Sequence, residues 1–192
     1  MKITSDKVKI AIVGKYVSLR DSYISLVEAI KHAGGANKTG IDLKWIDSET
    51  LTDNNVAEKL KDADGIIIPG GFGTRGVEGM ICACKYAREN KIPYLGICLG
   101  MQVTVIEYAR DVLGIKDATS GEFSESGSHV IDILPDKKGK KIGGTMRLGA
   151  YPCALKDGTK IKEAYANRDV IEERHRHRYE FNSDYLADFE NG

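Results

Sequence analysis

The 192 residues of the chain are enough for one α/β domain with a sizeable core and too few for two ordinary domains. The 28 lysines and arginines are balanced by 28 aspartates and glutamates, so the total charge does not favour nucleic acid or an anionic membrane as a partner. The N-terminus has no apolar stretch of signal-peptide length, and no segment approaches the ~20 apolar residues of a membrane span. We therefore expect a single cytoplasmic domain over residues 1–192.

Strands alternate with helices along the first part of the chain. Apolar or alternating runs predict strands, and helical spacing of apolar residues predicts helices between them. Gly34 and Gly35 are expected to end the first helix. In chain order, we expect a strand at 9–13, a helix from 21 or 22 to 34, a strand at 41–45, a short helix from 54 or 55 to 60, a strand at 65–68, a helix around 80–87, a buried strand at 92–97 and a helix at 99–110. This order predicts an α/β fold with an open, mostly parallel sheet, helices on both of its faces and right-handed crossovers.

The pattern changes after Ala118. Short runs, HVIDIL, TMRL and PCAL, are separated by Gly, Pro and Lys-rich turns, and residues 137–141 form a charged turn. This is typical of antiparallel strands, which we expect to extend or flank the sheet in the C-terminal part of the chain. No repeat, linker or break in composition marks a second domain.

The stretch PYLGICLGMQ, residues 93–102, combines a strand, a sharp turn and a helix. Gly96 and Gly100 flank Cys98 at the second position on either side, which is the arrangement of a nucleophile elbow. Because Cys98 precedes a helix, unpaired N–H groups and the helix dipole would favour its thiolate. The alternative is a small buried hydrophobe, the usual role of a free cysteine, but it explains neither the paired glycines nor the switch from strand to helix.

Three further cysteines, Cys82, Cys84 and Cys153, do not form a disulfide framework, which suits free thiols in a reducing compartment. Cys82 and Cys84 suggest a metal site, but residues two apart on a helix point about 200° away from each other. We therefore expect them to fill the core.

PGGFG, residues 69–73, offers backbone N–H groups at the tip of a buried strand, and these are candidate oxyanion donors beside a thiolate. Parallel strands bring such tips to one edge of the sheet, so PGGFG and GICLG are expected to share a pocket. The rival interpretation is a nucleotide site, since Gly71, Gly73 and Gly76 match G-x-G-x-x-G. No ribose-binding acid follows at the next strand, which argues against it.

Two charged residues are candidates for binding a small zwitterion. Glu122 lies in the polar segment TSGEFSES, and Arg178 in RHRHRYE. A strand over residues 174–181 would place the histidines on one face and the arginines on the other, and one such stripe is too narrow for nucleic acid. Glu122 would then bind an ammonium group and Arg178 a carboxylate.

Five motifs in this order, PGGFG, LGICLGMQ, GEF, GGTMRLG and RHRHRYE, resemble the class I (triad) glutamine amidotransferase domain of CTP synthase. The resemblance implies that Cys98 attacks the side-chain amide of glutamine, forms a γ-glutamyl thioester and releases ammonia. A separate synthetase domain would use this ammonia, with ATP and Mg²⁺, to aminate UTP. No cofactor is expected in the domain itself, while GTP as an activator and a homo-oligomeric intact enzyme are further expectations. Matched residue by residue, the oxyanion donors are Gly71 and Leu99, and glutamine is bound by Gly71, Leu99, Gln102, Glu122 and Arg178.

The chain departs from this family in one respect. The triad takes its His and Glu from a late H-P-E motif, which is absent here, and none of His32, His129, His175 and His177 fits that role. We expect the chain to be a fragment that lacks the catalytic His and Glu and the synthetase domain. The alternatives are a non-catalytic glutamine-binding or regulatory module, another class I amidotransferase, and an unrelated α/β cysteine hydrolase.

Overall fold

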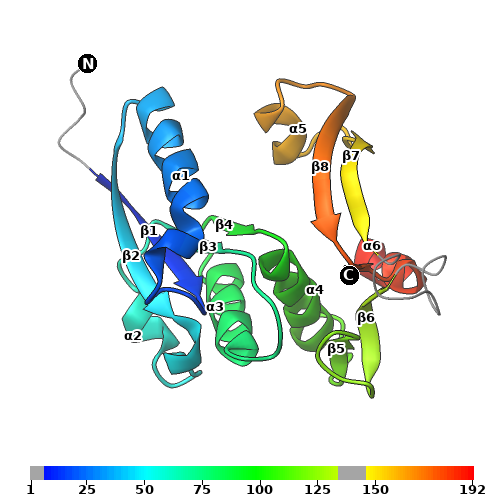
Figure 1. Ribbon diagram of the computed structural model, residues 1–192. Helices are drawn as coiled ribbons and strands as arrows, with labels where there is room; N and C mark the ends of the chain where they lie inside the picture. The colour runs from blue at the N-terminus through cyan, green and yellow to red at the C-terminus, as the bar shows by residue number, and fades with distance from the viewer. Residues whose placement is uncertain (1–6, 134–145) are drawn as a thin grey trace. The chain divides into compact units, whose positions relative to one another are not determined.

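The computed structural model (Figure 1) describes residues 7–133 and 146–192. The chain divides into two compact units, residues 1–132 with 181–192, and residues 133–180. The single-domain expectation stays a prediction, and the predicted charged turn at 137–141 lies outside the described residues. Within the described ranges, no helix is both long enough and apolar enough to cross a membrane.

The first unit is built on a parallel sheet of four strands in the order β2-β1-β3-β4. The strands are β1 (Lys7–Gly14), β2 (Gly40–Asp47), β3 (Gly65–Ile68) and β4 (Tyr94–Gly96). Ile67 of β3 lies opposite Leu95 of β4, and Ile12 of β1 lies opposite Ile67. The carboxyl ends of β1, β3 and β4 therefore lie along one edge, where ligands of open α/β sheets bind.

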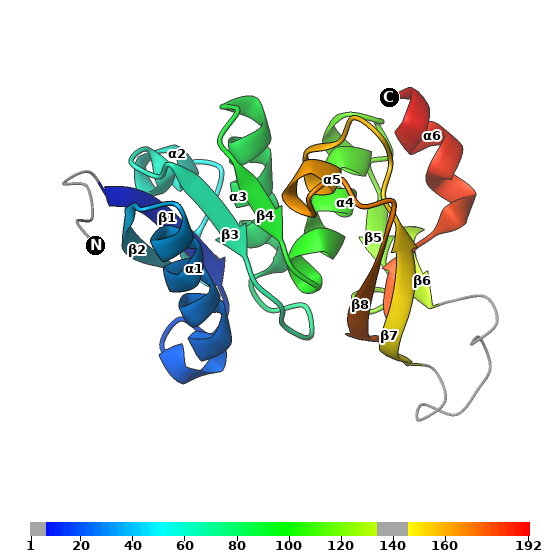
Figure 2. The same ribbon diagram turned by 90° about the horizontal axis from the view of Figure 1, so that it is seen from above.

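Helices cover both faces of this sheet, as the sequence predicts. Figure 2 shows α1 (Ile24–Ala36) on one face, with α2 (Val56–Leu60) and α3 (Val77–Glu89) on the other. The fourth helix, α4 (Leu99–Asp111), packs against α3, and Arg88 of α3 binds the buried carboxylate of Glu107 through Nη2–Oε1 at 2.7 Å. Short 3₁₀ turns, η1 (Arg20–Tyr23) and η2 (Ser48–Thr50), complete this part of the chain.

The prediction that Gly34 and Gly35 end the first helix is wrong. Helix α1 runs through both glycines to Ala36. A Cβ atom on Gly34 would lie 2.7 Å from Ile41 Cγ1 and 2.9 Å from the Thr39 carbonyl oxygen. Gly34 is therefore required because the helix packs closely on β2, and not because the chain turns there.

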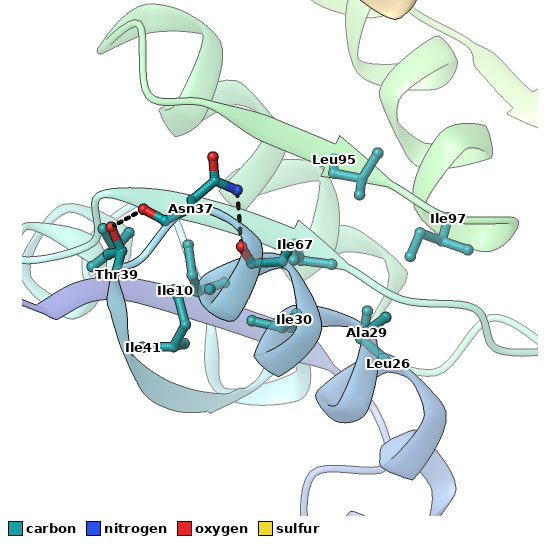
Figure 3. A pocket seen from close by; sticks show the side chains of 13 residues that line it. Ile10, Leu26, Ala29, Ile30, Asn37, Thr39, Ile41, Ile67, Leu95 and Ile97 are labelled. Atoms are coloured by element: carbon teal, nitrogen blue, oxygen red, sulfur yellow. Dashed lines mark hydrogen bonds between the residues drawn. The ribbon is translucent and has the colours of Figure 1, made fainter. Parts of the chain in front are cut away.

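The strand at residues 92–97 is less buried than the sequence predicts. Leu95 is 52% exposed and Ile97 is 39% exposed. Both side chains lie in an apolar groove of about 460 Å³ between α1 and the sheet. Figure 3 shows Leu95 and Ile97 among the side chains that line this groove, together with Ile67 and Ala29. Helix α1 thus covers the β1 side of this face more fully than it covers β4.

The C-terminal part contains the added strands. A three-stranded sheet has the order β5-β6-β9, and β7 pairs antiparallel with β8. The expectation of added antiparallel strands is confirmed by β7 and β8. The sequence did not predict β5, which pairs parallel with β6. The elements are β5 (Ala118–Ser120), β6 (Ser128–Ile133), β7 (Arg147–Ala154), α5 (Lys160–Ala164), β8 (Val170–His177), β9 (Tyr179–Phe181), η5 (Ser183–Tyr185) and α6 (Leu186–Asn191).

Candidate active site

Cys98 lies in the turn between β4 and α4, at the N-cap position of the helix. Its backbone angles are φ 55° and ψ −105°, a conformation that residues with a Cβ atom rarely adopt. The preceding residue, Ile97, donates a backbone hydrogen bond of 2.9 Å to the Ile68 carbonyl, so the turn is tied to the end of β3. Cys98 is exposed, as the sequence predicts for a nucleophile raised above the sheet.

The two glycines around Cys98 are sterically required. A Cβ atom on Gly100 would lie 2.0 Å from the Ile68 carbonyl oxygen, and one on Gly96 would lie 2.5 Å from the Gly100 carbonyl carbon and oxygen. These neighbours are backbone atoms and cannot rotate away. Only glycine at both positions lets the chain turn this tightly from strand into helix.

The loop after β3 lies beside this turn. A Cβ atom on Gly70 would lie 3.5 Å from Cys98 Cβ, and one on Gly71 would lie 3.1 Å from Leu99 Cδ2. The predicted oxyanion donors, Gly71 and Leu99, are therefore neighbours. Gly70, Gly71 and Cys98 line one cavity of about 720 Å³, so PGGFG and GICLG share a pocket as predicted.

Two of the predicted glutamine-binding side chains belong to the same region. The Glu122 carboxylate accepts a hydrogen bond of 3.0 Å from the Gly73 backbone N–H, which joins the segment after β5 to the PGGFG loop. Gln102, one turn into α4, is 4% exposed, and its Oε1 has no hydrogen-bond partner among the described residues. A buried acceptor without a partner is costly, and a bound ligand that donates a hydrogen bond would satisfy it.

Comparison with known proteins agrees with this geometry. The family model "Glutamine amidotransferase class-I" matches residues 18–191. The chain belongs to the class I glutamine amidotransferase family. It is 39% identical to the structure described as "Trypanosoma brucei CTPS - glutaminase domain with bound acivicin", with a TM-score of 0.90 over 96% of this chain and 72% of that one.

Curated relatives are named CTP synthase. The protein from Lactobacillus acidophilus is 56% identical over 186 residues, which are 96% of this chain and 34% of the relative. The protein from Carboxydothermus hydrogenoformans is 59% identical over 181 residues, 93% of this chain and 34% of the relative. The chain thus spans about a third of the length of these relatives and corresponds to their glutamine amidotransferase domain.

The thiol of this amidotransferase domain is not activated in the way that the sequence predicts. Although Cys98 as a whole residue is exposed, partial desolvation of its thiol raises the pKa of Cys98 above its ordinary value. The Leu99 backbone N–H lowers this pKa, and the negative charge of Glu122 raises it further. The helix N-terminus does favour the thiolate, but the loss of solvent around the sulfur outweighs it. A neighbouring base is therefore needed to deprotonate the thiol efficiently at neutral pH.

Among the described residues of the first unit, neither His32 nor His129 forms a hydrogen bond or ion pair with Cys98. His129 is the second residue of β6. His175 and His177 lie on β8, where His175 Nδ1 is 2.8 Å from His177 Nε2. This pair confirms that the two histidines share one face of the strand. The strand predicted over 174–181 is interrupted at Arg178, which lies in the second unit. The role of Arg178 in binding glutamine stays a prediction.

Cys82 and Cys84 are weaker acids than an ordinary thiol. Burial raises the pKa of Cys82 and of Cys84 to about 11. Cys84 is buried in the core as predicted, whereas Cys82 is only partly buried, with its sulfur 3.5 Å from Asp53 Oδ1. Within the described residues, no group of three or more acidic, histidine or cysteine side chains could hold a metal ion.

Sequence analysis missed Lys15, which follows the first predicted strand. Lys15 is 3% exposed, and its ammonium donates hydrogen bonds to two carbonyls of the PGGFG loop. Its position directly after β1 was the available signal, because β1 and β3 are neighbours whose carboxyl ends lie at the same edge of the sheet.

Proposed function

We propose that this domain hydrolyses the side-chain amide of L-glutamine through a thioester on Cys98. The ammonia would pass to a synthetase domain that uses ATP and Mg²⁺ to aminate UTP to CTP in the cytoplasm, with GTP as an activator and a homo-oligomeric intact enzyme. The observation that carries the proposal is the strained backbone of Cys98 beside the PGGFG loop. The names of the relatives support the choice of CTP synthase.

The proposed reaction proceeds in two steps. The Cys98 sulfur attacks the side-chain carbonyl carbon of glutamine, and the backbone N–H groups of Gly71 and Leu99 stabilise the negative charge that forms on the carbonyl oxygen. The C–N bond then breaks, and ammonia departs with the proton that the thiol gave up. Water hydrolyses the thioester to glutamate and returns the free thiol. Gln102, Glu122 and Arg178 would hold the substrate, the last two through its ammonium and carboxylate groups.

The second candidate is a non-catalytic glutamine-binding module. The raised pKa of Cys98, together with the lack of a described histidine of the first unit bonded to it, favours this candidate for the chain as it stands. General acid–base catalysis contributes roughly 10²–10⁴-fold to such reactions. We therefore expect this chain to release glutamate at least ~10² times more slowly than an intact CTP synthase.

Glutamate release from glutamine by three proteins distinguishes the candidates: the parent chain, Cys98→Ala and Cys153→Ala. Cys153 is the matched control because it is also a free, exposed cysteine. We expect slow release by the parent and by Cys153→Ala, and none above background by Cys98→Ala. Equal rates for the parent and Cys98→Ala, with glutamine binding retained in calorimetry, would identify the non-catalytic module instead.

A further inference from the structure

We infer that Lys15 is a positioning residue that fixes the PGGFG loop in the orientation needed for oxyanion stabilisation. The inference rests on the proposed function of the Cys98 site and adds a residue to it. Its basis is a set of contacts between the end of β1, the loop after β3 and the segment after β5. None of these contacts involves Cys98 directly, so Lys15 would act through the loop and not on the substrate.

The Lys15 side chain contacts the loop along its length. Its ammonium donates hydrogen bonds to the Phe72 carbonyl at 2.8 Å and to the Gly73 carbonyl at 2.7 Å. Its stem passes beside Gly71, where a Cβ atom would lie 3.2 Å from Lys15 Cδ and 3.4 Å from Cε. The Lys15 side chain therefore binds Phe72 and Gly73 through hydrogen bonds and passes beside Gly71, whose N–H is a predicted oxyanion donor.

The peptide group between Phe72 and Gly73 is held at both ends. In a trans peptide, the C=O and N–H groups point in opposite directions. Lys15 binds the Phe72 carbonyl, and the Glu122 carboxylate accepts from the Gly73 N–H at 3.0 Å. A positive group on one side and a negative group on the other thus fix the plane of this peptide. The Gly71 N–H lies two peptide units nearer the N-terminus, where the Lys15 stem passes beside the loop.

Burial makes a positioning role more suitable for Lys15 than direct ligand binding. A lysine that is 3% exposed has little surface to offer a ligand, and two of its three N–H donors already bind carbonyls. The pKa of Lys15 lies below its ordinary value, chiefly because of burial and next because of Arg75, while Glu122 and Glu49 raise it. Burying an ammonium is costly, and the loop carbonyls offset that cost where they bind it.

The test compares two electrophiles on the full chain. A diazo-ketone analogue of glutamine places its carbonyl where the glutamine amide carbonyl would lie, so its reaction depends on the oxyanion donors. Iodoacetamide needs only an accessible thiolate. In Lys15→Met we expect the maximal rate of Cys98 modification by the diazo-ketone to fall roughly ten- to hundredfold, because donors displaced by about 1 Å lose most of their effect. The half-saturating concentration and the iodoacetamide rate should change by less than about threefold, the effect of ~0.65 kcal/mol.

Lys59→Met is the matched control, since the Lys59 ammonium also binds a carbonyl, that of Thr50. It should leave both rates unchanged. If Lys15→Met does not fold, Lys15→Arg replaces it, because a planar guanidinium does not reproduce both bonds of the ammonium. A diazo-ketone rate that is unchanged, or that falls no further than the iodoacetamide rate, would overturn the inference.

Hydrogen exchange separates this inference from the proposed function. Loss of Lys15 should accelerate exchange of the Gly73 amide, whether or not the domain reacts with glutamine analogues. If the diazo-ketone fails to label the parent chain but Gly73 exchange still accelerates in the Lys15 variant, the proposed function is wrong. The inference that Lys15 fixes the PGGFG loop is then still supported. If Gly73 exchange is unchanged in a folded Lys15 variant, the inference that Lys15 fixes the loop is wrong.

Discussion

Cys98 carries its side chain on a backbone that is unfavourable for any residue except glycine. Such conformations cost of order 1–3 kcal/mol and persist only where the surroundings determine them. Here the surroundings are the two flanking glycines and the hydrogen bond from Ile97 to Ile68. The strain aims the thiol at the PGGFG loop, while desolvation raises its pKa above the ordinary value. At the residue scale, the fold positions the Cys98 thiol but does not lower its pKa.

The reactivity of Cys98 should therefore depend on Glu122. The carboxylate raises the pKa of the thiol, so Glu122→Gln should lower that pKa and increase the thiolate fraction below it. We expect faster modification by iodoacetamide at pH 7 to 8, with the pH profile displaced to lower pH. Peptide mapping across a pH series measures this, and Glu125→Gln, an exposed acid in the same segment, is the control. A profile displaced to higher pH would show that the Glu122 carboxylate does not raise the pKa of the Cys98 thiol.

Glutamine affinity should depend on Glu122 and Arg178. Free amino-acid recognition needs partners for an ammonium and a carboxylate, and losing one charged hydrogen bond costs about 1.5–3 kcal/mol, or roughly ten- to hundredfold in affinity. We expect that loss for Glu122→Ala and for Arg178→Ala in calorimetric titrations with glutamine.

Arg174→Ala is the control for Arg178→Ala. Arg174 is exposed on β8, whereas Arg178 is partly buried at the interruption after that strand. The two residues are also roughly 13 Å apart along an extended chain, too far to grip one carboxylate. If Arg174→Ala and Arg178→Ala weaken binding equally, or if Glu122→Ala has no effect, the wrong residues have been assigned to glutamine.

At the scale of elements, the elbow depends on how closely α4 approaches β3. Gly100→Ala would place a Cβ atom 2.0 Å from a backbone oxygen of β3, so we expect a loss of at least ~3 kcal/mol in the free energy of unfolding. Denaturant unfolding followed by circular dichroism measures this loss.

Gly35→Ala is the matched control for Gly100→Ala. Gly35 lies within α1, and a Cβ atom there would meet nothing within 4 Å. Alanine at this site should stabilise the helix by about 0.5–1 kcal/mol, because it loses less backbone entropy on folding. Similar effects of the two substitutions would mean that the elbow is not as tightly packed as described.

The same glycines show what the sequence could predict. Periodic apolar runs located the four parallel strands and their helices, because strand and helix periods are local properties. The spacing of Gly96, Cys98 and Gly100 located the elbow for the same reason. Gly34 was misinterpreted because a glycine needed for packing and a glycine that ends a helix look alike in one sequence.

At the scale of the whole molecule, the missed features are long-range. Lys15 binds carbonyls 57 and 58 residues away, and Gly73 binds a carboxylate 49 residues away. A lone lysine after a strand is usually exposed, so only the adjacency of β1 and β3 reveals its role. The chain spans about a third of the length of its curated relatives.

The central claim is that Cys98 is a nucleophile in a glutamine site. It is tested most directly by mapping where a diazo-ketone analogue of glutamine reacts in the folded chain, with and without excess L-glutamine. We predict modification at Cys98 that glutamine suppresses, and little at Cys82, Cys84 or the exposed Cys153, because Cys98 lies beside the PGGFG loop. Modification spread evenly over the four thiols, or absent from Cys98 in a folded sample, would contradict the claim.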